Sequence, residues 1–272
     1  MIISSNLAAQ SAANDLTRTS AALSKSLAKL SSGSRIVNAF DDAAGVAISM
    51  RFDSKLERAH AAKDNVSNAQ SFTNTQDGYL KRVAKTLNRM SELAMLSLDG
   101  TKSDADRSLY NNEFTQLKSY INDIATKEFN GVSLFSTANV ESVIDSEGTT
   151  FVMNGINLSS TSTTYNSVTQ LSTSIATTSA ATTALSSIRT AITQLASDRA
   201  QVGSYQSRLN MAGDYLAATI ESFTAASSAI KDVNVATEST EFSRQNILNQ
   251  STTAMLAQAN QLPQSVLRLL PS

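Results

Sequence analysis

The chain has 272 residues, with 22 lysines and arginines against 23 aspartates and glutamates, so its formal net charge is −1. This mixed charge lacks the basic stripe that neutralises a phosphate backbone, and we expect no binding to nucleic acid. There is no cysteine, which excludes disulfides and thiolate metal ligands, and two prolines and nine glycines are few enough to permit long helices.

The first apolar pattern lies near the N-terminus, over about residues 6–31. Its leucines recur at a period near 3.5 residues, which is typical of a helix that packs along another helix. They form a narrow stripe of Leu16, Leu23, Leu27 and Leu30. The segment Ser31–Ser34 contains a glycine and predicts a break after this helix.

A longer helical pattern follows Asp41 and Asp42 and continues to about Leu98, where Asp99-Gly100 ends it. Either aspartate can cap the helix, because a carboxylate accepts hydrogen bonds from the backbone N–H groups of the first turn. Some 55 residues at 1.5 Å each predict a helix of roughly 80 Å.

A second helix is predicted to start at Asp104 or Asp106 and to end at Asn130-Gly131. Beyond it, Val140–Ile144 and Thr150–Val152 are short apolar runs separated by turn residues, which predicts a small β-hairpin. Between residues 159 and 187, 18 of the 29 residues are serine or threonine. Because this density leaves little apolar surface for a core, we expect most of the segment to be solvated loop or a thin edge.

Helical periodicity returns in the C-terminal part of the chain. Apolar residues keep a rhythm of three and four from Leu185 to Ile230, and Asp232–Asn234 marks a weak boundary. The last segment repeats every seven residues at Leu248, Met255, Leu262 and Leu269. Long helices with short connections pack antiparallel. We therefore predict a mostly all-α fold, a long antiparallel helical bundle or coiled coil with a small β-hairpin insertion at about residues 132–165.

The two terminal stripes are too narrow to stabilise a helix pair alone, because short helices that bury little are marginal in water. We therefore expect the terminal helices to gain stability from neighbouring copies of the chain. The candidate self-assembly residues are Leu16, Leu23, Leu27, Leu30, Leu248, Met255, Leu262, Val266 and Leu269.

Catalytic and metal-binding patterns find no support in the sequence. His60 is the only histidine, and without a second histidine or a cysteine neither a zinc site nor a catalytic triad is expected. No phosphate-binding glycine loop of the form G-x-x-x-x-G-K-[ST] occurs. Asp41 and Asp42 point about 100° apart on a helix, which favours capping over paired carboxylate chemistry. We expect no enzyme activity, no catalytic residue, no metal and no cofactor.

Targeting signals are also missing from the sequence. No run of 18 apolar residues occurs, and residues 1–6 have neither a charged n-region nor an apolar stretch. We therefore expect no membrane-spanning helix and no cleaved secretory signal.

Several longer strings of residues are specific enough to indicate a protein family. The N-terminal part closely resembles the N-terminal signature of bacterial flagellin in Leu27–Ile36, Asp41–Ile48, Leu87–Ala94 and Phe129–Gly131. The C-terminal part resembles the other half of flagellin in Gly203–Leu209, Ser228–Asp232 and Thr253–Gln264. The resemblance covers about residues 1–135 and 185–270.

This resemblance implies a structural subunit that polymerises into the tubular flagellar filament for swimming motility. It implies an inner coiled-coil domain of residues 1–43 with 233–272, and a helical rod domain of residues 44–232 that carries the β-hairpin insertion. The interval between the two halves is too short for the outer domains of many flagellins, so we expect a thin and smooth filament.

The resemblance also implies where the chain acts and what it meets. The main partner is the chain itself, as a helical homopolymer, alongside a flagellar export chaperone, the filament cap and hook-junction proteins. Type III export without a cleaved signal would place it outside the cell, in the flagellum.

Two surface features follow from the resemblance as well. A vertebrate innate immune receptor would recognise a patch at Arg89, Leu93 and Glu113, with Ser91 where the family usually has arginine. Composition and the family's habit of carrying O-linked sugars make candidate glycosylation sites of Ser159, Ser160, Thr161, Ser162, Thr163 and Thr164.

Two alternative functions fit parts of the pattern. The hook–filament junction protein of the same family shares both terminal patterns, but it usually lacks the string Thr253–Gln264. A membrane-active helical protein would use the amphipathic ends, yet their polar faces carry serine and threonine rather than the lysine and arginine that attract anionic lipid. The filament subunit is therefore the favoured interpretation.

Overall fold

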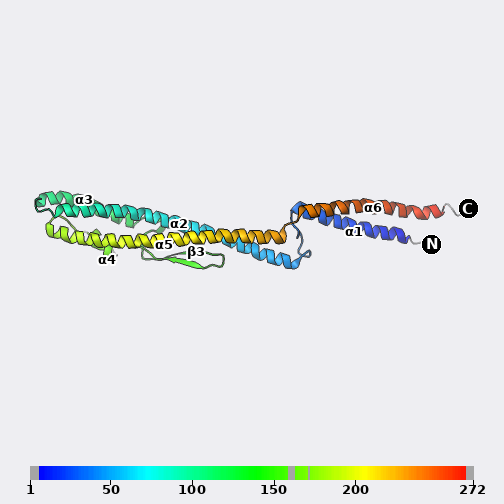
Figure 1. The fold of residues 1–272 in the computed structure, drawn as a ribbon, viewed down its shortest axis with the longest axis horizontal. Helices are drawn as coiled ribbons and strands as arrows, with labels where there is room; N and C mark the ends of the chain where they lie inside the picture. The colour runs from blue at the N-terminus through cyan, green and yellow to red at the C-terminus, as the bar shows by residue number, and fades with distance from the viewer. Residues whose placement is uncertain (1–5, 159–162, 171, 268–272) are drawn as a thin grey trace. The chain divides into compact units, whose positions relative to one another are not determined.

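The structure is a computed structural model that describes residues 6–158, 163–170 and 172–267 (Figure 1). Helices dominate it, and the strands form only two small antiparallel pairs, which confirms the predicted fold class. The elements are α1 (Leu7–Ser32), α2 (Ala43–Ser97), α3 (Asp104–Ala125), β1 (Glu128–Phe129), β2 (Val132–Ser133), β3 (Val140–Val143), β4 (Thr150–Met153), α4 (Thr163–Thr169), α5 (Thr178–Lys231) and α6 (Val235–Leu267).

The chain divides into two compact units. We call residues 1–54 with 222–272 the terminal unit, and residues 55–221 the central unit. Helices α2 and α5 contribute residues to both units, whereas α1 and α6 belong to the terminal unit alone. The assembly residues proposed from the sequence therefore fall in the terminal unit.

The start of α2 decides between the two candidate capping aspartates. The backbone N–H of Gly45 donates to Asp42 Oδ1 at 2.8 Å, so Asp42 caps the first turn. Asp41 instead forms an ion pair with Lys25 at 2.7 Å, and its Oδ2 accepts from the Asn38 backbone. Each aspartate thus has a separate structural task, and neither forms a carboxylate pair for acid–base chemistry.

The turn between α2 and α3 is held by side chains that the sequence pattern left unassigned. Ser103 is the cap of α3, and its hydroxyl exchanges hydrogen bonds with Asp106 in a capping box, while the helix itself starts at Asp104, which confirms one of the two predicted starts. Arg107 is buried and donates to the carbonyl oxygens of Ser97 and Asp99 at 2.8 and 3.0 Å. These bonds satisfy carbonyl groups that the end of α2 leaves without helical partners.

The β-strands form two hairpins in the central unit. Strands β3 and β4 pair antiparallel, which confirms the hairpin predicted for this segment. Asn130 and Gly131 have φ values of 51° and 77° and connect β1 to β2. Such a pair of positive φ values suits a two-residue hairpin turn. The prediction that Asn130-Gly131 ends the preceding helix was therefore wrong, because α3 already ends at Ala125.

The segment rich in serine and threonine is more ordered than its composition predicted. It contains α4 and the start of α5, so the prediction of a mostly solvated loop is wrong for these residues. Tyr165, Val168 and Ile175 are each at most 2% exposed and attach the segment to the core. The Tyr165 hydroxyl donates to Asp198 on α5 at 2.6 Å. A few well-placed apolar side chains thus outweigh the low helix propensity of the many hydroxyl residues.

The core of the central unit lies where the apolar rhythms of the sequence placed it. Helix α2 contributes Leu80, Val83, Leu87 and Met90, all at most 1% exposed. They pack in one cluster with residues of α3 and α5, including Phe114, Ile121, Ile188, Leu195 and Val202. The central unit therefore has a hydrophobic core of its own.

Candidate assembly interface

Helices α1 and α6 form an antiparallel pair within the terminal unit. Figure 1 shows α1 in blue beside α6 in orange to red. As the residue number rises along α1, the number of its partner on α6 falls, from Ala259 opposite Asn6 to Glu238 opposite Ser26. The structure therefore brings together the two terminal segments that the sequence singled out for self-assembly.

The contacts between these two helices are mainly polar. Ser26 Oγ donates to Glu238 Oε1 at 2.6 Å, and the hydroxyls of Thr19 and Thr252 lie 3.3 Å apart. Further hydrogen bonds join Asn249 Nδ2 to Ser20 Oγ at 2.7 Å and Asn6 Nδ2 to the Ala259 carbonyl oxygen at 2.8 Å. We call these four contacts the polar seam.

Burial follows the polar seam rather than the apolar stripes. Among the described side chains of α1 and α6, only Ser26, Thr252 and Ala259 are buried, at 2, 5 and 7% exposure. Two of these three carry hydroxyl groups. A single copy of the chain therefore uses small and polar side chains to join its two ends.

The apolar side chains predicted to drive assembly are left largely in solvent. Leu27, Leu248 and Met255 are 54, 42 and 54% exposed, while Leu16, Leu23 and Leu30 are half-buried. The structure adds three exposed residues that the seven-residue repeat did not include, Leu7, Val235 and Ile247. The side chains of Leu262 and Val266 on α6, and all of Leu269, lie outside the described part of the chain.

A second set of contacts ties the residues after α1 to the end of α5. The backbone N–H of Arg35 donates to the Lys231 carbonyl oxygen, and that of Val233 donates to the Gly33 carbonyl oxygen. Lys231 also forms an ion pair with Asp53 on α2. This hydrogen-bonded ion pair lowers the pKa of Asp53. The two segments that enter and leave the α1–α6 pair are thus fixed to each other.

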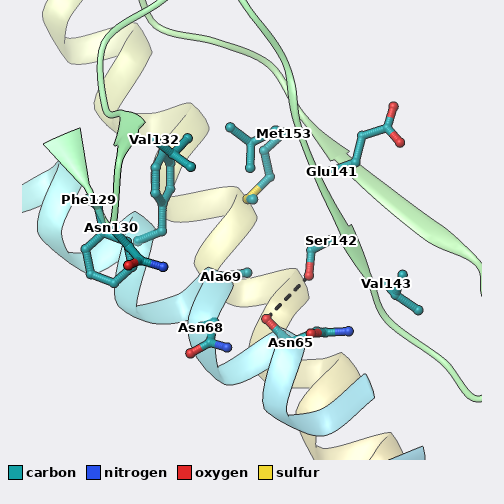
Figure 2. Close-up of a pocket in the computed structure, with 12 residues that line it drawn as sticks. Asn65, Asn68, Ala69, Phe129, Asn130, Val132, Glu141, Ser142, Val143 and Met153 are labelled. Atoms are coloured by element: carbon teal, nitrogen blue, oxygen red, sulfur yellow. Dashed lines mark hydrogen bonds between the residues drawn. The ribbon is translucent and has the colours of Figure 1, made fainter. Parts of the chain in front are cut away.

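Figure 2 shows a groove in the central unit. It measures about 650 Å³ and lies between α2, with Asn65, Asn68 and Ala69, and the two hairpins. The Ser142 hydroxyl of β3 points to α2 and donates to the Asn65 carbonyl oxygen at 3.5 Å. Glu141 is the only charged side chain among the described residues that line the groove, so these residues supply no acid–base pair.

Comparison with known proteins decides the family. Residues 3–140 match the bacterial flagellin N-terminal helical region, and residues 185–270 match the bacterial flagellin C-terminal helical region. The chain belongs to the bacterial flagellin family. The two matched regions contain α1 and α6, so the polar seam joins the N-terminal and C-terminal regions of a flagellin.

Similar flagellins span the whole chain. Flagellin FlaB1 of Treponema pallidum (strain Nichols) is 33% identical over 287 residues, covering 99% of this chain and 100% of the relative. A flagellin of Halalkalibacterium halodurans is 35% identical over 276 residues with the same coverage. The crystal structure of Bacillus cereus flagellin matches with a TM-score of 0.50 at 28% identity, covering 56% of this chain and 88% of that one.

The three residues of the expected receptor patch differ in exposure, because Arg89 and Glu113 are exposed and Leu93 is buried. Arg89 donates to both carboxylate oxygens of Glu113, at 2.7 and 3.0 Å, and also pairs with Glu92. These bonds raise the pKa of Arg89 and lower that of Glu113. Leu93, in contrast, is 0% exposed in the core of the central unit. The expectation that Leu93 belongs to an exposed patch is therefore corrected.

The remaining predicted positions lie elsewhere on this flagellin. Ser159, Ser160, Thr161 and Ser162 are outside the described residues, Thr163 starts α4, and Thr164 is half-buried. His60 is exposed on α2. Within the described ranges, no group of three or more His, Asp or Glu side chains is placed to hold a metal ion. Over those same ranges, no helix combines the length and the apolar character needed to cross a membrane.

Proposed function

We propose that this chain is a structural subunit that polymerises into a flagellar filament, and that its terminal segments 1–43 and 233–272 carry the main contacts between copies. The proposal rests on the burial pattern of the α1–α6 pair, in which polar side chains are buried and apolar side chains are exposed. Ser26 and Thr252 are buried there, while Leu27, Leu248 and Met255 face solvent. A helix pair that hides polar groups and exposes apolar ones gains by meeting further copies of itself.

The energetics support a requirement for neighbours. Complete burial of a leucine or methionine side chain contributes about 1.5–3 kcal/mol relative to exposure. Ordering the backbone costs about 1–2 kcal/mol per residue. Because a single copy leaves much of its apolar stripe exposed, apolar burial within it offsets only part of the ordering cost. Each added neighbour increases burial without repeating the ordering cost, so the ends become stable in the polymer.

The same proposal places the chain outside the cell, in the flagellum, with no catalytic role. Its partners would be other copies of the chain, together with an export chaperone, the filament cap and hook-junction proteins. The relatives named above are called flagellins, which favours the filament subunit over a junction protein. Residues 44–232 would form the rod around the inner terminal helices, and sugars on residues 159–164 are proposed from their hydroxyl content.

A second proposed function, recognition by an innate immune receptor, rests on the pair of Arg89 and Glu113. Both side chains are more than two-fifths exposed, at 42 and 45%, and their bidentate hydrogen bonds fix α3 against α2. A partner would meet a preorganised surface there, which lowers the entropy cost of binding. Arg89→Ala should weaken receptor activation by the isolated chain, whereas Lys85→Ala, on the same helix, should leave it unchanged.

The assembly role is tested by seeded growth of filaments. We compare the full chain with a chain that lacks residues 243–272 and with the double variant Leu248→Ala, Met255→Ala. Alanine keeps the helix propensity and removes only the exposed apolar groups. The matched control is Ser243→Ala with Gln250→Ala, which changes two exposed polar residues of the same helix.

We expect the truncated chain to keep a folded central unit, as judged by thermal unfolding, yet to add nothing to the seeds. The double leucine–methionine variant should raise the critical concentration, and the control should grow like the full chain. Growth of the truncated chain at the normal rate would show that the ends do not carry assembly.

A further inference from the structure

We infer that the polar seam sets the register of assembly, and that Ser26 and Glu238 are its positioning residues, which fix the axial offset of α6 against α1. The apolar residues of both helices then present one defined surface to the next copy. The inference rests on the proposed assembly function and adds to it the residues that determine specificity. It concerns why the seam is polar, which the apolar repeat alone does not explain.

The first step of the argument is the distribution of contacts along the pair. Ser26 meets Glu238 at one end, Thr19 meets Thr252 in the middle, and Asn6 meets the carbonyl group of Ala259 at the other end. One turn of helix is about 5.4 Å, far longer than a hydrogen bond. A slip by a single turn therefore breaks all of these contacts at once.

The second step is the penalty for such a slip. A hydrogen bond across the seam adds modest stability, but a buried polar group that loses its partner pays the full cost of desolvation. Ser26 is 2% exposed, and the side chain of Glu238 is 15% exposed and also forms an ion pair with Lys29 on α1 at 3.7 Å. Wrong registers thus leave a shielded carboxylate and a shielded hydroxyl unpaired.

The third step compares this seam with an apolar one. Leucine faces repeat along a helix and fit each other in several registers, whereas a polar pair at one position accepts a single register. Here the apolar residues Leu27, Leu248 and Met255 lie mostly outside the seam, where they are free to meet other copies. Polar contacts within one copy therefore set the register of α1 against α6. Apolar side chains are left for burial between copies.

The test measures register directly with engineered disulfides, because the chain has no cysteine of its own. The reporter pair Thr19→Cys with Thr252→Cys replaces two hydroxyls that lie 3.3 Å apart. Two offset reporters, Ala22→Cys with Thr252→Cys and Asp15→Cys with Thr252→Cys, detect a slip of about one turn in either direction. Filaments are grown from parent seeds under reducing conditions and then oxidised.

Each reporter is placed in three backgrounds. The first is the parent sequence, and the second is the seam variant Ser26→Ala with Glu238→Met, which removes the polar pair and keeps side-chain length. The third is the matched control Ser24→Ala with Glu241→Met, because Ser24 is exposed and Glu241 pairs with Arg244 and Gln245 of its own helix. Thermal unfolding of the central unit is recorded for every protein.

We expect the parent and the control to cross-link only through residues 19 and 252. In the seam variant, an offset disulfide should increase about tenfold and seeded elongation should slow about tenfold, the factor associated with one hydrogen bond to a charged group. A seam variant that cross-links and elongates like the control overturns the inference while leaving the assembly role intact. Failure of the reduced parent to extend seeds overturns both.

Discussion

Lys118 on α3 donates from Nζ to the carbonyl oxygen of Thr173 at 2.7 Å, in a position where the lysine side chain is almost fully buried. The same ammonium group donates to the Gln170 carbonyl oxygen at 2.8 Å, directly after the end of α4. A cation at a helix C-terminus satisfies orphan carbonyl groups and complements the helix dipole. The contact fixes the middle of the segment rich in serine and threonine to α3.

Replacing this lysine should therefore destabilise the central unit. Burial lowers the pKa of Lys118, so desolvation of the ammonium opposes its contribution. Lys118→Met relieves that cost but removes the charged donor from both carbonyl oxygens, although that of Gln170 still accepts from the Thr173 backbone N–H at 3.1 Å. We expect the free energy of unfolding to fall by about 1.5–3 kcal/mol, the usual contribution of a hydrogen bond to a charged group. Guanidinium denaturation followed by circular dichroism measures it, with the exposed Lys85→Met as control.

The buried Leu93 gives a second prediction on stability. Leu93→Ala opens a cavity in the core of the central unit, and we expect a loss of about 2–5 kcal/mol in the free energy of unfolding. Leu96→Ala is the matched control on the same helix, because its side chain is 40% exposed, and we expect a change within about 0.5 kcal/mol. Equal denaturation midpoints for the two variants would contradict the packing described for α2.

This pair of variants also bears on receptor recognition. A loss of recognition in Leu93→Ala has two sources, direct contact or a loosened core, and the structure favours the second because Leu93 is 0% exposed. Arg89→Ala removes an exposed contact without opening the core. Recognition lost in Arg89→Ala at unchanged unfolding free energy would therefore identify the exposed pair as the contact.

Acid stability should depend on Asp77 of α2. Burial alone would raise its pKa, but hydrogen bonds from Lys81 and Arg199, at 2.7 and 3.0 Å, outweigh burial and lower it. A carboxylate whose folded pKa lies below its unfolded value stabilises the fold above the unfolded pKa, near 4. That contribution is lost as the pH falls through the folded pKa.

Asp77→Asn should therefore lower the unfolding free energy at neutral pH and flatten its decline below about pH 4. Denaturation curves of the central unit between pH 2 and pH 7 measure both effects. Asp64→Asn, an exposed position on the same helix, provides the control for a lost charge. If the unfolding free energies of the parent and of Asp77→Asn declined in parallel below about pH 4, the ion pairs of Asp77 with Lys81 and Arg199 would have no role in acid stability.

The sequence indicated much of the helical fold because apolar spacing is a local signal. Leu80, Val83, Leu87 and Met90 share one face of a helix whatever its partner, so their burial in the core was predictable. The hairpin of β3 and β4 was equally local, since two apolar runs flanked a turn. These elements needed no knowledge of tertiary contacts.

The failures have a common physical origin in contacts distant in sequence. The local sequence around Tyr165 and Ile175 does not predict that these side chains reach the core. Their burial orders a segment dominated by hydroxyl groups. The leucine stripes likewise identified α1 and α6 but not which face of each helix meets the other. The hydrogen bond between Ser26 and Glu238 joins residues 212 positions apart, so no local pattern could reveal it.

The glycine at position 45 gives a last prediction, because it lies where a side chain does not fit. A Cβ atom on Gly45 would be 2.5 Å from Asp42 Oδ2 and 2.8 Å from Ile36 Cδ1. Gly45→Ala must therefore displace the capping carboxylate, and loss of such a cap costs about 1 kcal/mol. Gly78→Ala is the matched control in α2, since nothing lies within 4 Å of its added Cβ, and it should stabilise the central unit by about 1 kcal/mol.

The two glycine variants should consequently affect different properties, because Gly45 lies in the terminal unit and Gly78 lies in the central unit. Gly45→Ala changes the terminal unit, so we expect slower elongation from seeds with an unchanged unfolding transition of the central unit. Gly78→Ala should raise that transition and leave elongation unaltered. If Gly45→Ala elongates like the parent, the close packing of Asp42 and Ile36 against Gly45 has no part in assembly, and the terminal contacts depend on α1 and α6 alone.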